Sequence, residues 1–312
     1  MIVRTRRLGA LILATGLLAV ACGSSATPSP SAGGGASTAP STPTASTGGG
    51  ASSSPAAVAC ETGSITAAGS TALQPLVDQA GKDYVAACSG AQIQVQGGGS
   101  GTGLTQVSQG AVQIGDSDVT AESKLDAAAA GTLVDHVVAK QGWIMVVNPD
   151  VTGVTSLTKQ QATDIWTGKV TNWKDVGGPD EAIQLILRPE SSGTRSTFKK
   201  LVLGGAAEAS GTALTEDSNG AVVNAVKTTP GSTSVIGFAY FKQNEGQVTG
   251  LGLDGVEANV ANMKNGTYIL AAEGHMYTKG EPTGLAKSFL DYILGPTVQG
   301  TTIPGLNYAP VK

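Results

Sequence analysis

Residues 188–195 read RPESSGTR, and this stretch decides the fold. It joins a run that favours a β-strand, Gln184–Arg188, to a helical pattern over Ser196–Leu203. Strands that alternate with helices in this way are typical of α/β folds with mostly parallel sheets. Ligands of such folds bind where strands end and helices begin. An arginine at the strand end, followed by a Ser-Gly-Thr helix start, therefore indicates a binding loop.

The same alternation continues on both sides of this loop. Strands are expected at Ser64–Ala68, Ile93–Gln96, Val112–Gly115, Trp143–Val147 and Val235–Phe241, and helices at Ala72–Ala87, from Leu104 onward, at Leu157–Trp166, Gly220–Thr228 and Thr283–Tyr292. The 312 residues suffice for one large or two ordinary domains. Because no repeat of solenoid length is visible, the simplest interpretation is an α/β chain with two lobes.

Two further loops also stand between a strand and a helix. The first, Gly69-Ser70-Thr71-Ala72, places hydroxyls where a helix N-cap belongs, and a simple cap is its plainer interpretation. The second, GGGSGTG at residues 97–103, lets backbone N–H groups converge, although alone it is a weak nucleotide-like signal. Helix N-termini carry unpaired N–H donors and partial positive charge, and an arginine fork binds two oxygens at once. Together these loops predict a site for a tetrahedral oxyanion.

Two acidic residues, Asp116 and Asp118, follow the strand expected at Val112–Gly115. A carboxylate accepts a hydrogen bond from the proton of HPO4²⁻ or H2PO4⁻, but it repels sulfate, which has no proton at neutral pH. An acidic residue in an anion site would therefore select phosphate. A helix cap or a salt bridge to Arg188 is the alternative role.

Composition narrows the class of protein. The formal net charge is −4 and no basic cluster is present, which argues against a nucleic-acid partner. Apolar residues make up 40% of the chain and charged residues 13%, as in a globular protein. The two histidines, His136 and His275, have no metal-ligand spacing, so neither a metal nor another cofactor is expected, and both are interpreted as surface or packing residues.

The N-terminus has the pattern of an export signal and a tether. A basic start precedes the short apolar run Leu8–Val20, and LLAVACG at residues 17–23 resembles a bacterial lipobox, although Ala19 stands where Leu is usual. Residues 1–21 are then a signal peptide, and Cys22 is the lipidated anchor residue. Residues 22–59, nearly all Ser, Gly, Ala, Thr and Pro, predict a flexible linker. A plain secretory signal and a glycosylated stalk are the alternatives.

Removing residues 1–21, which carry three arginines and no acidic residue, takes the net charge from −4 to −7. The two remaining cysteines, Cys60 and Cys88, are free to pair in an exported compartment. A structural disulfide is favoured over two free thiols.

The chain resembles the PstS-like phosphate-binding proteins of bacterial ABC phosphate importers. The resemblance runs from about Ile65 to the C-terminus, and it rests on ITAAGST at residues 65–71, the glycine loop 97–103, IGDSD at 114–118 and RPESSGT at 188–194. A further similar stretch, residues 157–173, has no ligand role that can be assigned. The family's phosphate contacts correspond to Ser70, Thr71, Ala72, Ser100, Asp118, Arg188, Ser192, Gly193 and Thr194.

The resemblance implies that Asp118 accepts the phosphate proton, since spacing favours it over Asp116, which stands where a small residue is common in the family. It also implies a type II periplasmic-binding-protein fold with a hinge between two lobes. Residues 60–136 plus 270–312 would form lobe one and residues 137–269 lobe two.

The function implied is that of an extracytoplasmic, lipid-anchored, monomeric binding protein that delivers inorganic phosphate to the membrane subunits of an ABC importer. An enzyme is not expected. The alternatives are a binding protein for another oxyanion such as sulfate, molybdate or tungstate, a surface sensor or adhesive protein, and a phosphatase-like hydrolase. The last has no support beyond the hydroxyls, because no histidine lies near them and no Gly-x-Ser-x-Gly elbow is present.

Overall fold

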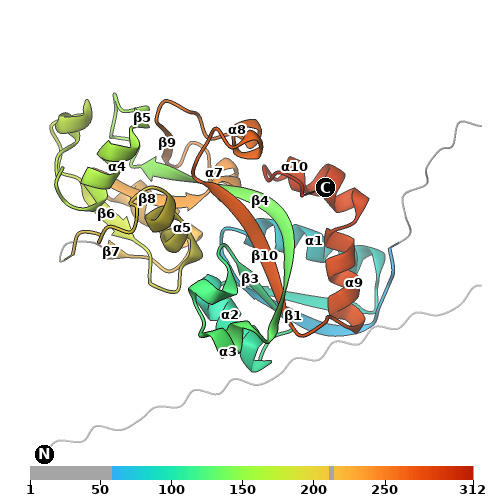
Figure 1. Ribbon diagram of the computed structural model, residues 1–312. Helices are drawn as coiled ribbons and strands as arrows, with labels where there is room; N and C mark the ends of the chain where they lie inside the picture. Colours follow the sequence, from blue (N-terminus) through green and yellow to red (C-terminus); the bar gives the residue numbers. More distant parts are fainter. Residues whose placement is uncertain (1–57, 211–213, 312) are drawn as a thin grey trace, which may run out of the picture. The chain divides into compact units, whose positions relative to one another are not determined.

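The computed structural model describes residues 58–210 and 214–311, all of which belong to one compact unit (Figure 1). The expected signal peptide, the anchor residue Cys22 and residues 22–57 of the expected linker lie outside the described residues. Within the described ranges, no helix has the length and apolar character needed to cross a membrane.

The strands form one ten-stranded mixed sheet, in the order β2-β1-β3-β10-β4-β8-β6-β7, with β9 also paired to β4 and β5 paired to β9. Its strands are β1 Gly63–Gly69, β2 Ala91–Gln96, β3 Ile114–Ser117, β4 Leu133–Val147, β5 Ser156–Leu157, β6 Gln184–Leu187, β7 Leu214–Thr215, β8 Ser232–Gly237, β9 Thr249–Leu253 and β10 Ala271–Lys279. Pairing is parallel at both ends of this order, among β2, β1 and β3 and among β8, β6 and β7.

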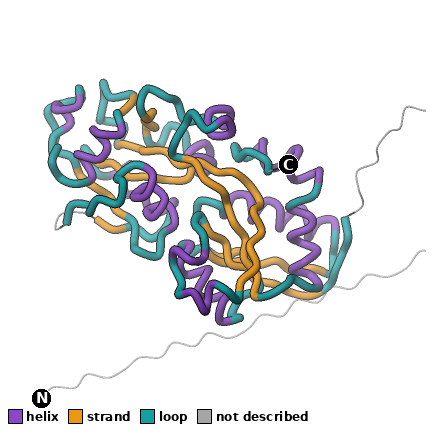
Figure 2. Tube along the Cα trace, viewed as in Figure 1, coloured by secondary structure: helices purple, strands orange, loops and turns teal. Residues whose placement is uncertain are grey.

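Two long antiparallel strands connect these parallel ends. The first part of β4 pairs with β10, and its last five residues, Trp143–Val147, pair with β8. Figure 2 shows β4 and β10 as adjacent curved strands that run from one group of strands to the other. The register of this pair shifts between Gly274 and His275, which is a β-bulge, and bulges bend and twist strands.

The helices follow the strands, as an α/β fold requires. They are α1 Gln74–Ala87, α2 Ser100–Gln109, α3 Ala127–Ala130, α4 Lys159–Trp166, α5 Gly193–Leu201, α6 Asn219–Thr228, α7 Phe238–Gln243, α8 Val260–Asn265, α9 Gly284–Ile293 and α10 Ile303–Gly305, with short turns η1 Ala121–Ser123, η2 Trp173–Val176 and η3 Val298–Thr302. Apolar side chains at helical spacing, such as Leu76, Val77, Ala80 and Tyr84 of α1, form the buried faces.

The buried apolar side chains form two large clusters. One surrounds α1, β1 and α9 and includes Leu76, Tyr84 and Phe289. The other surrounds the end of β4 with β8, α5 and α6, and includes Trp143 and Phe198. Because β4 and β10 contribute residues to both, the two clusters are joined through this strand pair.

The α/β class is confirmed, with corrections to individual elements. Val235–Phe241 was expected to be one strand, but β8 ends at Gly237 and Phe238–Gln243 is helix α7. This expectation was wrong because a short apolar run has no periodicity that separates a strand from a buried helix. Helix α2 begins at Ser100 rather than near Leu104, so the glycine loop opens directly onto its first turn.

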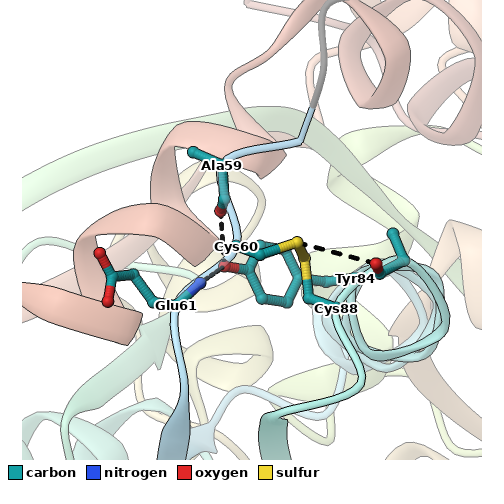
Figure 3. Close-up of a disulfide and its surroundings, with 6 residues drawn as sticks. Ala59, Cys60, Glu61, Tyr84 and Cys88 are labelled. Atoms are coloured by element: carbon teal, nitrogen blue, oxygen red, sulfur yellow. Dashed lines mark hydrogen bonds between the residues drawn. A yellow bond between two sulfur atoms is a disulfide. The ribbon is translucent and has the colours of Figure 1, made fainter.

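The structure pairs Cys60 with Cys88, with a Cα–Cα distance of 5.3 Å (Figure 3). The bridge connects the segment before β1 to the residue that ends α1. Beside it, the Tyr84 hydroxyl donates to the Ala59 carbonyl at 2.8 Å and accepts from the Glu61 amide at 3.2 Å. The segment that leads into β1 is therefore attached to α1 by covalent and hydrogen bonds.

Candidate anion-binding site

The carboxylate of Asp118 is the centre of the site. It lies directly after β3, only 3% exposed. Its Oδ1 accepts hydrogen bonds from the Ser70 hydroxyl and, at 3.0 Å, from Nε2 of Gln141. Its Oδ2 accepts from the Thr194 hydroxyl at 3.2 Å. Residues from four distant parts of the chain thus meet at one carboxylate.

The guanidinium of Arg188 lies beside it at the end of β6. Nε donates to the Glu216 carbonyl, and Nη2 donates to the Asp217 carbonyl, both at 3.0 Å. Nη2 also donates to the Thr71 hydroxyl at 3.4 Å. Nη1 is buried and has no protein acceptor among the described residues. Because a buried charged donor without a partner is costly, Nη1 is a group that a bound anion would satisfy.

Three serine hydroxyls stand at the helix starts that surround these two groups. Ser70 Oγ accepts from the Ala72 and Leu73 amides, each at 3.1 Å, and so organises the turn before α1. Ser100 Oγ accepts from the Asp118 amide at 2.9 Å, and Ser192 Oγ caps α5 by accepting from the Arg195 amide at 3.2 Å. The expected N-terminal hydroxyls therefore shape the loops by accepting backbone hydrogen bonds, and the single proton of Ser70 is donated to Asp118.

Gly193 allows two of these helix starts to meet. A Cβ atom at this position would lie 2.1 Å from Ser100 Oγ and 2.6 Å from Asp118 Cβ, so any side chain would collide. The Gly101 amide also donates to the Ser191 carbonyl at 2.8 Å. The start of α5 therefore packs directly against α2 and Asp118.

Burial controls the electrostatics of the site. Burial raises the pKa of Asp118, while hydrogen bonds from Ser70 and Gln141 and the nearby Arg188 charge act in the opposite direction. Burial likewise lowers the pKa of Arg188, and the charge of Asp118 opposes this shift. Within the described ranges, no Asp118–Arg188 ion pair is formed, so that alternative role for the carboxylate is not realised.

The residues expected from sequence come together in this structure. Ser70, Thr71, Ala72, Ser100, Asp118, Arg188, Ser192, Gly193 and Thr194 are all buried and lie in the loops just described. Asp116 is buried as well, but its side chain makes no hydrogen bond to these groups, and its electrostatic neighbours include Asp78 on α1.

Three further residues of the site were missed. Gln141 bonds Asp118, Trp143 Nε1 donates to the Thr194 hydroxyl at 3.1 Å, and Asn219 Nδ2 donates to the Thr71 hydroxyl at 3.0 Å. A signal existed for Asn219, because Ser218-Asn219-Gly220 is a polar helix start of the kind singled out elsewhere. Gln141 carried a weaker signal, a polar residue just before a buried apolar run.

The fold and this site define a class of α/β protein. Polar loops at the ends of its strands enclose a buried carboxylate and a buried guanidinium with an unsatisfied donor. Consistent with it, the model of the PBP superfamily domain matches residues 54–297. Phosphate-binding protein PstS of Bacillus subtilis (strain 168) is 48% identical over 248 residues, which cover 80% of this chain and 81% of that protein. The chain belongs to the PBP superfamily and, within it, to the PstS family of phosphate-binding proteins.

Solved structures agree with this assignment. A substrate-binding protein of Clostridium perfringens, with bound phosphate, superposes with a TM-score of 0.73 at 28% identity, covering 80% of this chain and 100% of that one. An ABC-type phosphate transport receptor of Vibrio cholerae gives a TM-score of 0.61 at 27% identity, covering 78% and 99%. The expected two-lobe periplasmic-binding-protein fold is confirmed.

Proposed function

We propose that this chain captures inorganic phosphate in a cleft between two lobes and delivers it to an ABC-type phosphate importer. One observation carries the proposal: a buried carboxylate, Asp118, shares its site with a buried guanidinium whose Nη1 has no acceptor in the described protein. An oxyanion that carries a proton fits both groups, because it can accept from Arg188 and donate to Asp118. Phosphate has this property at neutral pH, whereas sulfate does not.

The lobes are proposed to comprise residues 60–136 plus 270–312 and residues 137–269. Most members of each of the two apolar clusters fall within one proposed lobe, which supports this division, and β4 with β10 would form the hinge. Bonds from Arg188 to Thr71 and from Thr194 to Asp118 then join the lobes in a closed arrangement. Because both lobes would contact the ligand, binding would shift the open–closed equilibrium toward this state.

The remaining parts of the proposal concern the setting of the protein. Closure would be recognised by the importer's membrane subunits, and the chain itself would act as a monomer and not as an enzyme. Residues 1–21 would direct export, lipidated Cys22 would anchor the chain extracytoplasmically, and residues 22–59 would connect the anchor to the lobes. Membership of a substrate-binding family supports the non-enzymatic role.

The test is isothermal titration of the purified chain, freed of carried-over ligand by partial unfolding and refolding. We expect tight one-to-one binding of phosphate and no heat with sulfate at neutral pH. Tight sulfate, molybdate or tungstate binding instead would assign another oxyanion, and the absence of any anion binding would favour a sensor or adhesive protein.

Two variants test the assigned roles. Arg188→Ala should weaken the binding of every anion, because it removes the cation. Asp118→Asn should reduce the exclusion of sulfate more than it reduces phosphate binding, because an amide can donate to an oxyanion without a proton. An asparagine variant with undiminished discrimination would disprove the role of Asp118.

A further inference from the structure

Gln141 lies within β4, one of the two long strands that join the apolar clusters, and its side chain is only 1% exposed. Resting on the proposed function, we propose that Gln141 is a positioning residue: it holds Asp118 with one carboxylate oxygen turned to the ligand and thereby sets how well the site rejects oxyanions without a proton. The family resemblance assigned no role to this position.

The two oxygens of Asp118 have different surroundings. Oδ1 accepts from both Ser70 and Gln141, so its lone pairs are already used. Oδ2 accepts only the longer bond from Thr194, at 3.2 Å, and lies close to Gly193, where a Cβ atom would be 2.9 Å away. The oxygen available for a ligand proton is therefore Oδ2, and the two donors on Oδ1 prevent the carboxylate from rotating.

The amide of Gln141 is oriented by this contact. Nε2 donates to the carboxylate at 3.0 Å, whereas Oε1 is buried and has no partner among the described residues. A flipped amide would place Oε1 against the carboxylate, which is repulsive. An unpaired Oε1 is unfavourable, so this orientation does not satisfy all the hydrogen-bonding groups of Gln141 itself. Its described polar contact is Asp118.

Selectivity depends on the charge of Asp118. Burial raises its pKa, and the hydrogen bonds from Ser70 and Gln141 hold the pKa down. A protonated Asp118 would donate a hydrogen bond and so would accept sulfate as readily as phosphate. Other titratable or charged groups interact with Asp118 or Asp116, or line the same cavity, and they contribute to any pH profile: Asp116, Lys124, Arg188, Lys200, Glu273, His275 and Tyr308.

The experiment compares three full-length variants with the wild type by titration of phosphate and sulfate from pH 5 to pH 9. Gln141→Met removes the donor but keeps the length, and Gln141→Glu keeps the shape and replaces the amide by a carboxyl group. Gln299→Met is the matched control, because Gln299 is also buried and its Nε2 donates to the carbonyls of Val138 and Ile293, not to Asp118.

For Gln141→Met we expect a roughly tenfold weaker phosphate affinity at pH 7, which is the lower end of the value of one hydrogen bond to a charged group. This variant should also bind sulfate near pH 5 to 6, a pH range in which the wild type shows no sulfate binding. For Gln141→Glu the phosphate affinity should fall steeply as pH rises, because the new carboxyl group donates to Asp118 only while it is protonated. Gln299→Met should leave the ratio of phosphate to sulfate affinity and its pH profile as in the wild type.

The proposal is overturned if either Gln141 variant loses phosphate affinity equally at every pH with unchanged sulfate discrimination, which is what loosened packing alone would give. It is also overturned if both variants bind like the wild type. If Gln141→Met does not fold, Gln141→Glu alone decides the matter, through the expected fall of its phosphate affinity as pH rises. Failure of the wild type to bind phosphate would instead remove the proposed function, and this inference with it.

Discussion

The burial of Asp116 leads us to predict that the unfolding free energy falls as pH rises toward 8. Its side chain is 1% exposed and Oδ1 has no hydrogen-bond partner among the described residues. Burial, together with the charges of Asp78 and Asp118, raises its pKa from 3.8 to about 8. The folded chain therefore holds a proton on Asp116 at neutral pH that the unfolded chain releases. We expect Asp116→Asn, which is neutral at every pH and nearly isosteric, to be more stable than the wild type at pH 8.

The sign and size follow from proton linkage. The folded state binds more protons than the unfolded state between pH 3.8 and about 8, so the stability supplied by protonated Asp116 is complete below this window and falls as pH rises through it. Each unit of pKa difference corresponds to 1.36 kcal/mol. Between pH 5 and pH 8 the wild type should therefore lose on the order of 4 kcal/mol through this group, a loss that Asp116→Asn avoids.

Urea unfolding of both proteins at pH 5, 6, 7 and 8 in phosphate-free buffer measures this difference. Asp118 also has a raised pKa and contributes a slope of the same sign, but it is present in both proteins and is removed by taking their difference. The difference in unfolding free energy should grow in favour of the variant as pH rises. A difference independent of pH, or a variant less stable than the wild type at pH 8, would refute the argument that Asp116 is buried in its protonated form.

Three further perturbations test closure and covalent stabilisation. Lys124→Met should release phosphate roughly three to ten times faster in stopped-flow displacement, because the Lys124 ammonium donates to the Glu190 carbonyl at 2.5 Å and to the Ser196 hydroxyl at 2.7 Å. An unchanged rate would show that these two hydrogen bonds do not stabilise the closed state. Gly193→Ala should fold normally but weaken phosphate binding at least tenfold in titration, since its Cβ would meet Ser100 Oγ on closure, and unchanged affinity would show that the loops separate at little expense. Replacing Cys60 and Cys88 by Ser should lower the unfolding free energy by roughly 3 to 4 kcal/mol in urea with phosphate affinity retained, and no loss would argue against a bridge in the native chain.

The parts of the fold that could be predicted are those with a periodic pattern. Helix α1 was placed within two residues of its observed start because its apolar residues repeat at helical spacing. Strand β10, which pairs with β4 over nine residues, was not predicted at all. Its sequence, AAEGHMYTK, has a glycine and several polar residues, and it becomes a strand because β3 and β4 pair with both of its edges. Such a tertiary cause has no local signal.

The site shows the same division. Loops with glycine, hydroxyls and Arg188 were visible because the requirements of an anion appear locally, at single helix starts. The contacts that orient the Asp118 carboxylate and the Thr71 hydroxyl were not visible. Gln141 lies in strand β4 and Asn219 at the start of helix α6, and no spacing rule connects either residue to residues 70–118. Pairing of β4 with β10 places Gln141, and the packing of α6 beside β8, where Asn219 Oδ1 accepts from the Gly237 amide at 3.1 Å, places Asn219. These contacts follow from topology and not from any motif.

The arrangement explains how a chain with a net charge of −4 can hold an anion. The Arg188 guanidinium lies beside Asp118, and its Nε and Nη2 donors are already engaged with the carbonyls of Glu216 and Asp217. Its Nη1 is left without a protein acceptor among the described residues. Neutral donors must then supply the remaining attraction, and they are worth most where burial excludes water. This makes binding depend on closure, because opening would hydrate Arg188 and Asp118 separately. Affinity should accordingly be more sensitive to residues that hold the loops together, such as Gly193, than to surface charge or ionic strength.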